Sequence, residues 1–178
     1  MAANLPSGGA FPQPVQIGKI ILMRPIDDII ARHEFFKDFR PDHLELLQSC
    51  AEEKRFNRDQ YLLRQGQGAE RFFLIRKGEV HLELVSPEGR RISMQVLGPG
   101  DIVGWSWMVP PYKWSFDAQA VETTIAIVFD GAALRKRCEK DFEFASRIQG
   151  KICEALTRRL VAACEQILEL HEGRELEE

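Results

Sequence analysis

The feature that most constrains the fold is a series of short apolar runs between Lys54 and Phe129, separated by turns that contain glycine. The runs lie at 61–63, 72–75, 80–85, 92–97, 102–103, 118–121 and 125–129. Gly78, Gly89 and the segment Gly98–Asp101 lie between consecutive runs. Short strands at such even spacing are typical of a β-sandwich or a β-barrel. We therefore expect a mainly β fold over residues 54–130.

Helical patterns flank the strand region on both sides. Residues 17–53 are predicted to form an N-terminal helical segment, with a short helix over 26–35 and a second helix that begins at Pro41 and ends near Glu53. Residues 131–172 are predicted to form a short hinge helix over 131–138 and then a long helix. Residues 1–16 lack the charged start and apolar core of a secretory signal and are predicted to be a flexible tail. Residues 173–178 form an acidic tail.

The long helix carries an apolar stripe. Its members are spaced three or four residues apart: Ile148, Ile152, Leu156, Leu160, Ala163 and Ile167. Such a stripe packs either on the chain's own barrel or on the same helix of a second chain as a coiled coil. We predict a homodimer that forms through this helix, and we expect Cys153 and Cys164 to be packing residues within it.

Composition excludes several functional classes. The net charge is −3, whereas nucleic-acid binders usually carry a basic patch. No apolar run approaches the ~20 residues of a membrane span. The four cysteines form no CxxC pair, which argues against a structural zinc or iron–sulfur site. Only His81 of the four histidines lies in a predicted barrel strand, and there is no HxH pair, so a metal-dependent barrel enzyme is not expected. No P-loop or nucleophile elbow is present. A non-enzymatic protein of the cytoplasm is predicted.

Two motifs carry a resemblance to a known family. The segment 65–80 reads QGQGAERFFLIRKGEV, and Pro99–Gly104 reads PGDIVG. Both resemble the cyclic nucleotide-binding domain of the catabolite activator and FNR-type regulators, and the resemblance covers about residues 34–170. It implies a jelly-roll β-barrel with flanking N-terminal helices and a long C-terminal helix. It also implies a phosphate-binding cassette that begins near Gly104.

The cassette departs from the pattern of the family it resembles. There a glutamate holds the ribose hydroxyl and an arginine holds the phosphate, but here these positions fall at Trp105 and near Trp114, and only Lys113 offers a positive charge. The candidate pocket residues are Gly100, Asp101, Gly104, Trp105, Ser106, Trp107, Lys113, Trp114 and Ser115. Loss of charge-assisted hydrogen bonds, each worth about 1.5–3 kcal/mol, would weaken binding of cAMP or cGMP. The tryptophans either fill the pocket or form an aromatic wall for a different ligand.

The resemblance also bears on function. Transcription factors of this family carry a winged helix-turn-helix after the long helix, whereas here an acidic segment follows, so direct DNA binding is not expected. The basic run Arg135–Arg137 is interpreted as a solvated helix face. We predict a regulatory or sensor domain that acts through another protein and takes a small-molecule ligand, with no metal. The alternative is a ligand-free interaction scaffold whose aromatic loop fills the former nucleotide pocket.

Overall fold

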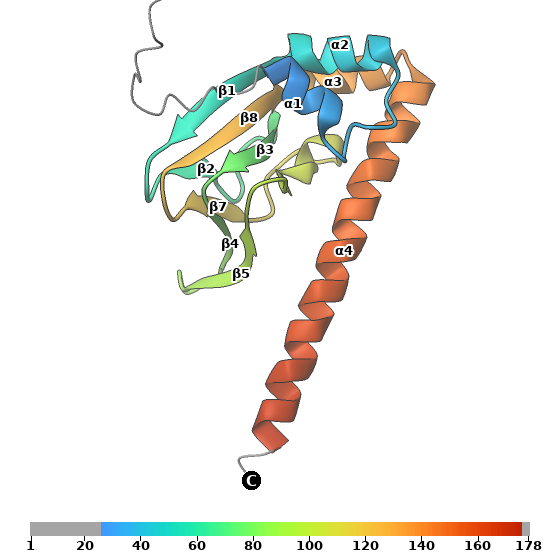
Figure 1. Cartoon of the computed structure of the whole chain (residues 1–178). Coiled ribbons are helices and arrows are strands. Elements are labelled where there is room, and N and C mark those ends of the chain that lie inside the picture. The colour runs from blue at the N-terminus through green and yellow to red at the C-terminus, as the bar shows by residue number, and fades with distance from the viewer. Residues whose placement is uncertain (1–25, 176–178) are drawn as a thin grey trace, which may run out of the picture.

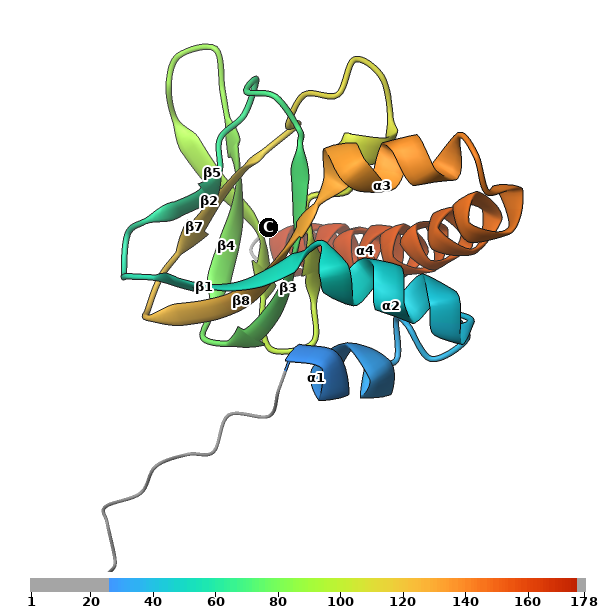
Figure 2. The same ribbon diagram turned by 90° about the horizontal axis from the view of Figure 1, so that it is seen from above.

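The computed structural model describes residues 26–175, so the predicted tail 1–16 lies outside the described residues. Two four-stranded sheets form the centre of the molecule, short helices gather at one end of them, and a long helix runs away from that end (Figure 1). Figure 2 shows the short helices and the start of the long helix beside the same end of the sheets. The mainly β fold with flanking helices and a long C-terminal helix is therefore confirmed.

Each sheet is antiparallel throughout. The first contains β1 (Ala51–Phe56), β8 (Thr124–Asp130), β3 (Arg71–Lys77) and β6 (Ile102–Val103), in that order. The second contains β2 (Tyr61–Leu63), β7 (Asp117–Ala120), β4 (Val80–Val85) and β5 (Arg91–Leu97). In the described part of the chain no pairing joins an edge strand of one sheet to the other. The two sheets of the predicted jelly roll are not closed into a barrel.

The N-terminal helices are α1 (Ile26–Arg32) and α2 (Pro41–Ser49). Pro41 begins α2 as expected, but the predicted end near Glu53 is wrong, because β1 already begins at Ala51. Residues 51–56 pair with β8 in unbroken antiparallel register, from Ala51 opposite Phe129 to Phe56 opposite Thr124. These ladder hydrogen bonds override the local helical pattern.

The C-terminal helices are α3 (Gly131–Cys138) and α4 (Phe142–Glu175). The apolar stripe of α4 divides along its length: the side chains of Ile148 and Ile152 are 0% and 9% exposed, whereas those of Leu160 and Ile167 are 66% and 55% exposed. Only the first part of the stripe packs on the chain's own core. Cys153 and Cys164 are exposed in the single chain and do not pack on its core.

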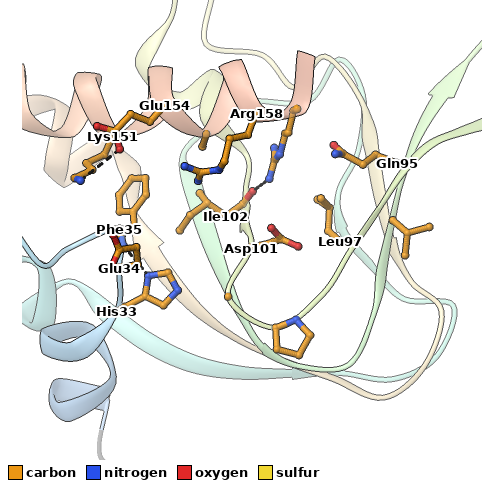
Figure 3. Close-up of a pocket in the computed structure, with 15 residues that line it drawn as sticks. His33, Glu34, Phe35, Gln95, Leu97, Asp101, Ile102, Lys151, Glu154 and Arg158 are labelled. Carbon is orange, nitrogen blue, oxygen red and sulfur yellow. Dashed lines mark hydrogen bonds and ion pairs between the residues drawn. The ribbon is translucent and has the colours of Figure 1, made fainter. Parts of the chain in front are cut away.

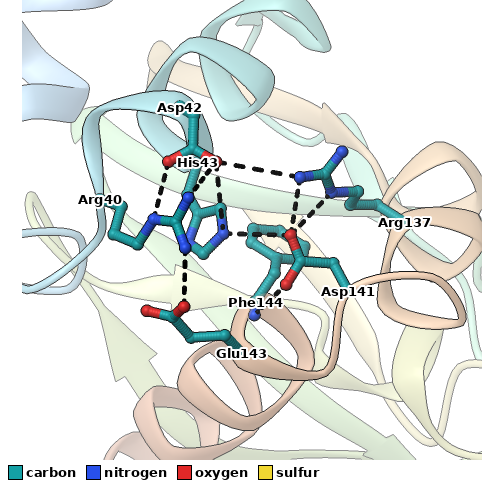
Figure 4. Close-up of polar contacts among 7 residues, drawn as sticks. All are labelled: Arg40, Asp42, His43, Arg137, Asp141, Glu143 and Phe144. Carbon is teal, nitrogen blue, oxygen red and sulfur yellow. Dashed lines mark hydrogen bonds and ion pairs between the residues drawn. The ribbon is translucent and has the colours of Figure 1, made fainter.

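A polar cluster joins α2 to the start of α4 (Figure 4). The fully buried His43 places its Nε2 atom 3.2 Å from Oδ2 of Asp141. The other carboxylate oxygen of Asp141 accepts a hydrogen bond from the backbone N–H of Phe144, and the Arg137 guanidinium lies 2.6 Å from Oδ2. The Phe144 N–H and then Arg137 lower the pKa of Asp141 to about 2. Asp141 therefore stays ionised and fixes the start of α4 against α2.

Candidate functional site

The cassette is the segment that connects β6 to β7, and it begins with a sharp change of backbone direction at Gly104. Gly104 adopts a left-handed conformation, with φ 87° and ψ 66°, and a 3₁₀ helix, η1 (Trp105–Met108), follows directly. A Cβ atom on Gly104 would lie 2.9 Å from the ring of Trp114 and 3.3 Å from Leu63. Both the backbone angle and the close approach require glycine at this position.

Backbone hydrogen bonds fix the second half of the cassette to the loop between β2 and β3. Trp114 donates its N–H to the carbonyl of Gln67 at 2.9 Å, and its own carbonyl accepts from Gly66 at 2.9 Å. The N–H of Ala69 donates to the carbonyl of Tyr112 at 2.7 Å. Lys113 pairs with Gly68 through an isolated bridge, and its side chain is exposed. The one cation that the sequence offered for a phosphate thus lies on the surface.

Side chains fill the space that the cassette encloses. The remaining cavity measures about 10 Å³ and is lined by Leu63, Leu82, Gly104, Trp105, Ser106, Trp114, Ser115, Phe116 and Arg159. A cavity needs at least ~10–15 Å³ to hold one water molecule. This small cavity by itself has no room for a nucleotide, and it shares Leu82, Trp105, Phe116 and Arg159 with a cavity of about 230 Å³ between β4, β5 and α4.

Trp107 belongs to the core and does not line this cavity. It is fully buried and stacks on Phe72 with the ring centroids 5.5 Å apart, and Phe72 in turn stacks on Phe129 at 4.3 Å. The stack attaches η1 to β3 and β8. A Cβ atom on Gly131, the first residue of α3, would lie 3.0 Å from Trp107, so α3 also packs closely against this ring.

Arg135 of α3 holds the cassette from the outside. Its Nη1 atom donates to the carbonyl of Trp107 at 2.7 Å and to the carbonyl of Ala69 at 3.0 Å. Its guanidinium lies 4.6 Å from the ring centroid of Tyr112, a cation–π distance. The interpretation of this basic run as a solvated face is wrong for Arg135, which ties α3 to Trp107 and Tyr112 of the cassette and to the β2–β3 loop at Ala69.

Two further arginines near the cassette are bound to Asp117 at the start of β7. Arg91 lies 2.6 Å and Arg64 lies 3.3 Å from the same carboxylate oxygen, and the backbone N–H of Gln65 donates to the other oxygen at 2.6 Å. Burial alone would raise the pKa of Asp117, but the Gln65 N–H and Arg91 hold it below its ordinary value. These guanidinium groups therefore pair with a buried carboxylate of the chain itself.

Arg159 of α4 is a site residue that the sequence reasoning missed. Its side chain lines the small cavity, and its guanidinium donates to the carbonyl of Ile102 in β6. Burial lowers the pKa of Arg159, and nearby Asp101 partly opposes this effect. Arg159 lies 43 residues beyond the end of the cassette at Phe116, so the only signal in the sequence was its position on α4 three residues after Leu156.

The candidate residues from the sequence therefore separate into several places. Five come together around the small cavity: Gly104, Trp105, Ser106, Trp114 and Ser115. Gly100 and Asp101 lie in the turn between β5 and β6, where Asp101 accepts a hydrogen bond from the N–H of Gly98 at 2.8 Å. This turn lines a different and larger cavity (Figure 3). Trp107 is a core residue, and Lys113 is exposed.

Among residues 26–175, no three His, Cys, Asp or Glu side chains gather closely enough to hold a metal ion. In the same range, no helix combines the length and the apolar character of a membrane span.

The two-sheet fold, the cassette after β6 and the long final helix together form the fold of a regulatory domain. The family model described as the cyclic nucleotide-binding domain matches residues 53–141, half of the chain. The chain belongs to this family.

Two curated relatives and two solved structures illustrate the match. A CRP-like cAMP-activated global transcriptional regulator of Mycobacterium tuberculosis is 26% identical over 110 residues, which cover 62% of this chain and 49% of the relative. The anaerobic regulatory protein of Bacillus subtilis is 25% identical over 127 residues, which cover 65% of this chain and 53% of the relative. The chain spans about half the length of these relatives.

Among solved structures, a cyclic nucleotide-binding domain from Methylobacillus flagellatus superposes with a TM-score of 0.67 and 24% identity, covering 81% of each chain. The catabolite activator protein of Thermus thermophilus superposes with a TM-score of 0.59 and 20% identity, and the match covers 77% of this chain and 62% of that structure. At these identities the structures establish the fold alone.

Proposed function

We propose that this chain is a non-enzymatic regulatory domain whose nucleotide pocket is filled by its own side chains, so that it does not bind cAMP or cGMP in the way its family name describes. The observation that carries the proposal is the cavity of about 10 Å³ between Trp105, Trp114 and Leu63. A phosphate in a semi-buried site needs charge-assisted hydrogen bonds. Among the described residues, Arg159 is the only cation that lines this cavity.

The proposed output runs through α3 and α4. Arg135 and the stack of Trp107 on Phe72 connect the cassette to α3 on one side and to the first sheet on the other. A regulatory domain works when a ligand or a partner binds one of two arrangements more tightly than the other. A change in the cassette would therefore shift α3 and α4 together.

Homodimerisation through α4 is part of this proposal. Four large apolar side chains on the second half of α4 are exposed, and we name them the outer stripe: Leu160, Val161, Ile167 and Leu168. Contiguous exposed apolar surface on a helix marks an interaction site. The spacing of these residues suits packing against the same helix of a second copy. A different protein partner on this face is the competing outcome.

Calorimetric titration and thermal unfolding of the full chain test the proposal, with cAMP, cGMP and, as a control, 5′-AMP. A ligand that binds only the folded state raises Tm with a dependence on its concentration. We expect no heat of binding and no increase in Tm up to millimolar cyclic nucleotide. A saturable increase in Tm with cAMP or cGMP, absent with 5′-AMP, would overturn the proposal.

A further inference from the structure

Cys164 lies at the centre of the outer stripe on α4. Each of the four apolar members of the stripe precedes or follows Cys164 by three or four residues. Residues at this spacing are neighbours on the surface of a helix, with their Cβ atoms about 5–6 Å apart. The four apolar side chains therefore surround the thiol of Cys164 on one face of the helix.

This face of α4 is exposed in the single chain. The side chain of Leu160 is 66% exposed and that of Ile167 is 55% exposed, and Cys164 is an exposed, free thiol. Figure 1 shows that the end of α4 extends beyond the two sheets. Ile152 marks the face that packs on the chain's own core, and Cys164 lies about 120° around the helix from it. The thiol therefore points away from that core.

The stripe suits a second copy of the same chain. In a helix pair with twofold symmetry, the residue at the centre of the contact faces its own copy. A charged side chain at that point would repel its counterpart, whereas a thiol does not. The nearby charged residues Arg158 and Glu165 lie about 120° and 100° around the helix from Cys164, outside the stripe. An uncharged centre with four apolar neighbours is thus compatible with itself.

Such a pair would place the two Cys164 residues within reach of a disulfide bond. The axes of packed helices are about 8–10 Å apart, and each Cα atom lies about 2.3 Å from its own axis. Two Cα atoms that face each other are then roughly 3.5–5.5 Å apart, which overlaps the ~4.4–6.8 Å that disulfides span. Because Cys164 is the midpoint of the stripe, this holds for parallel and for antiparallel helices.

The other three cysteines each lack one of these properties. Burial raises the pKa of Cys50 to about 11 and also raises the pKa of Cys138, and a protonated thiol is a poor nucleophile. Cys153 is exposed, but it lies about three helical turns before Cys164 and outside the outer stripe. Cys164 alone combines an exposed thiol with a central position in an apolar face.

We propose that Cys164 is a redox-sensitive site at which two copies of the chain are joined by a disulfide bond between their Cys164 residues. The inference rests on the homodimer proposed above and adds a covalent, reversible step to it. A peroxide oxidises one thiol to a sulfenic acid and releases water, and the second thiol then forms the S–S bond and releases another water. In total, two thiols and one hydrogen peroxide give one disulfide and two waters, so two electrons pass from the sulfurs to the peroxide.

The bond would make the pair independent of protein concentration. A helix pair held by apolar contacts alone dissociates on dilution, because its stability depends on the concentration of protomers. The linked pair remains together until a reducing thiol cleaves the bond by exchange. Oxidation would therefore hold the two α4 helices together, and reduction would return them to a concentration-dependent equilibrium.

Hydrogen peroxide is the test oxidant, and the readouts are non-reducing electrophoresis and mass mapping of the linked peptides. Sedimentation equilibrium first gives the mass of the reduced full chain. Peroxide should then produce a covalent dimer that dithiothreitol reverses, and its linked peptides should both contain Cys164. Cys164→Ser should form at least about tenfold less covalent dimer, whereas Cys153→Ser should form as much as the unaltered chain.

A displaced thiol tests whether the position matters. Glu165→Cys in the Cys164→Ser background keeps four cysteines but moves the thiol about 100° around the helix, so it should form little covalent dimer. A covalent dimer that persists in Cys164→Ser, or that forms equally well from the displaced thiol, would overturn the inference. The lack of a covalent dimer in a chain that sediments as a dimer would overturn it too, and would leave the proposed homodimer intact. A reduced chain that sediments as a monomer would contradict both.

Discussion

The ring of Trp114 lies against the backbone of Gly104, so close that a Cβ atom on Gly104 would stand 2.9 Å from Cζ3 of the indole. The first residue of the cassette and one of its last thus meet across the space that the cassette encloses. This contact, together with Leu63, reduces that space to about 10 Å³. The filled pocket is therefore a property of a specific pair of residues, and it can be tested at that pair.

Gly104→Ala should destabilise the protein through both the backbone angle and the contact with Trp114. A non-glycine residue in the left-handed region costs roughly 1–2 kcal/mol, and the added methyl group must also displace the indole. Gly89→Ala is the matched control, because Gly89 has a similar φ of 80° but no atom within 4 Å of the added Cβ. Urea unfolding should show that Gly104→Ala lowers the free energy of unfolding by at least about 1 kcal/mol more than Gly89→Ala does. Equal losses would mean that the indole moves aside freely.

Arg135→Gln should loosen the cassette from α3. The variant loses the charge-assisted hydrogen bonds to the carbonyls of Trp107 and Ala69, which are worth about 1.5–3 kcal/mol each at most. Hydrogen exchange should become faster in residues 104–116 and in α3, with little change in the distant β4–β5 hairpin. Lys136→Gln, at an exposed neighbouring position, is the control. Unchanged exchange in the cassette would contradict the role given to Arg135.

Asp141→Asn should remove a dependence of stability on acid pH. The pKa of Asp141 falls from 3.8 to about 2 in the folded state, so its carboxylate stabilises the fold above about pH 4 and this stabilisation is lost as the pH falls toward 2. The asparagine can still accept from the Phe144 N–H but cannot pair with Arg137. The free energy of unfolding, measured with urea between pH 2 and pH 6, should therefore depend less steeply on pH in the variant than in the unaltered chain. Asp27→Asn, on the exposed face of α1, should keep the slope of the unaltered chain.

Leu160→Glu should convert the proposed homodimer into a monomer. A charge at the first position of the outer stripe would be buried without a partner in a helix pair, and this is strongly unfavourable. Because the side chain is 66% exposed in a single chain, the monomer itself should change in stability by no more than about 0.5 kcal/mol. Sedimentation equilibrium should give the mass of a dimer for the unaltered chain and the mass of a monomer for Leu160→Glu. Glu169→Lys, exposed on α4 outside the outer stripe, should remain dimeric; a dimer that survives Leu160→Glu would rule out this seam.

The strand region could be predicted because its signals are local. The alternation of apolar residues and the turns at Gly78 and Gly89 each depend on only a few neighbouring residues. Both glycines have the positive φ that such turns need. The end of α2 could not be predicted in this way. Residues 51–53 fit a helical pattern, and only the presence of β8, some seventy residues later in the chain, makes them a strand.

The candidate site was predicted only where its residues lie within one motif. Trp105 and Trp114 were found because the cassette motif contains them. That Trp107 belongs to the core and does not line the small cavity depends on which face of η1 meets Phe72, and the motif does not determine this. Arg159 reaches the cassette through the packing of α4 on β6, which no local pattern records. The division of the α4 stripe has the same origin, because the sheets are long enough to cover only its first part.

The three tryptophans of the chain all lie within the ten residues from Trp105 to Trp114. Trp107 and Trp114 are buried, and Trp105 is only partly covered. The tryptophan fluorescence of the protein therefore comes from one short segment, with no indole elsewhere in the sequence to mask it. Any molecule or partner that rearranges the cassette should change the emission spectrum directly, so the protein carries its own optical reporter without a dye or a label.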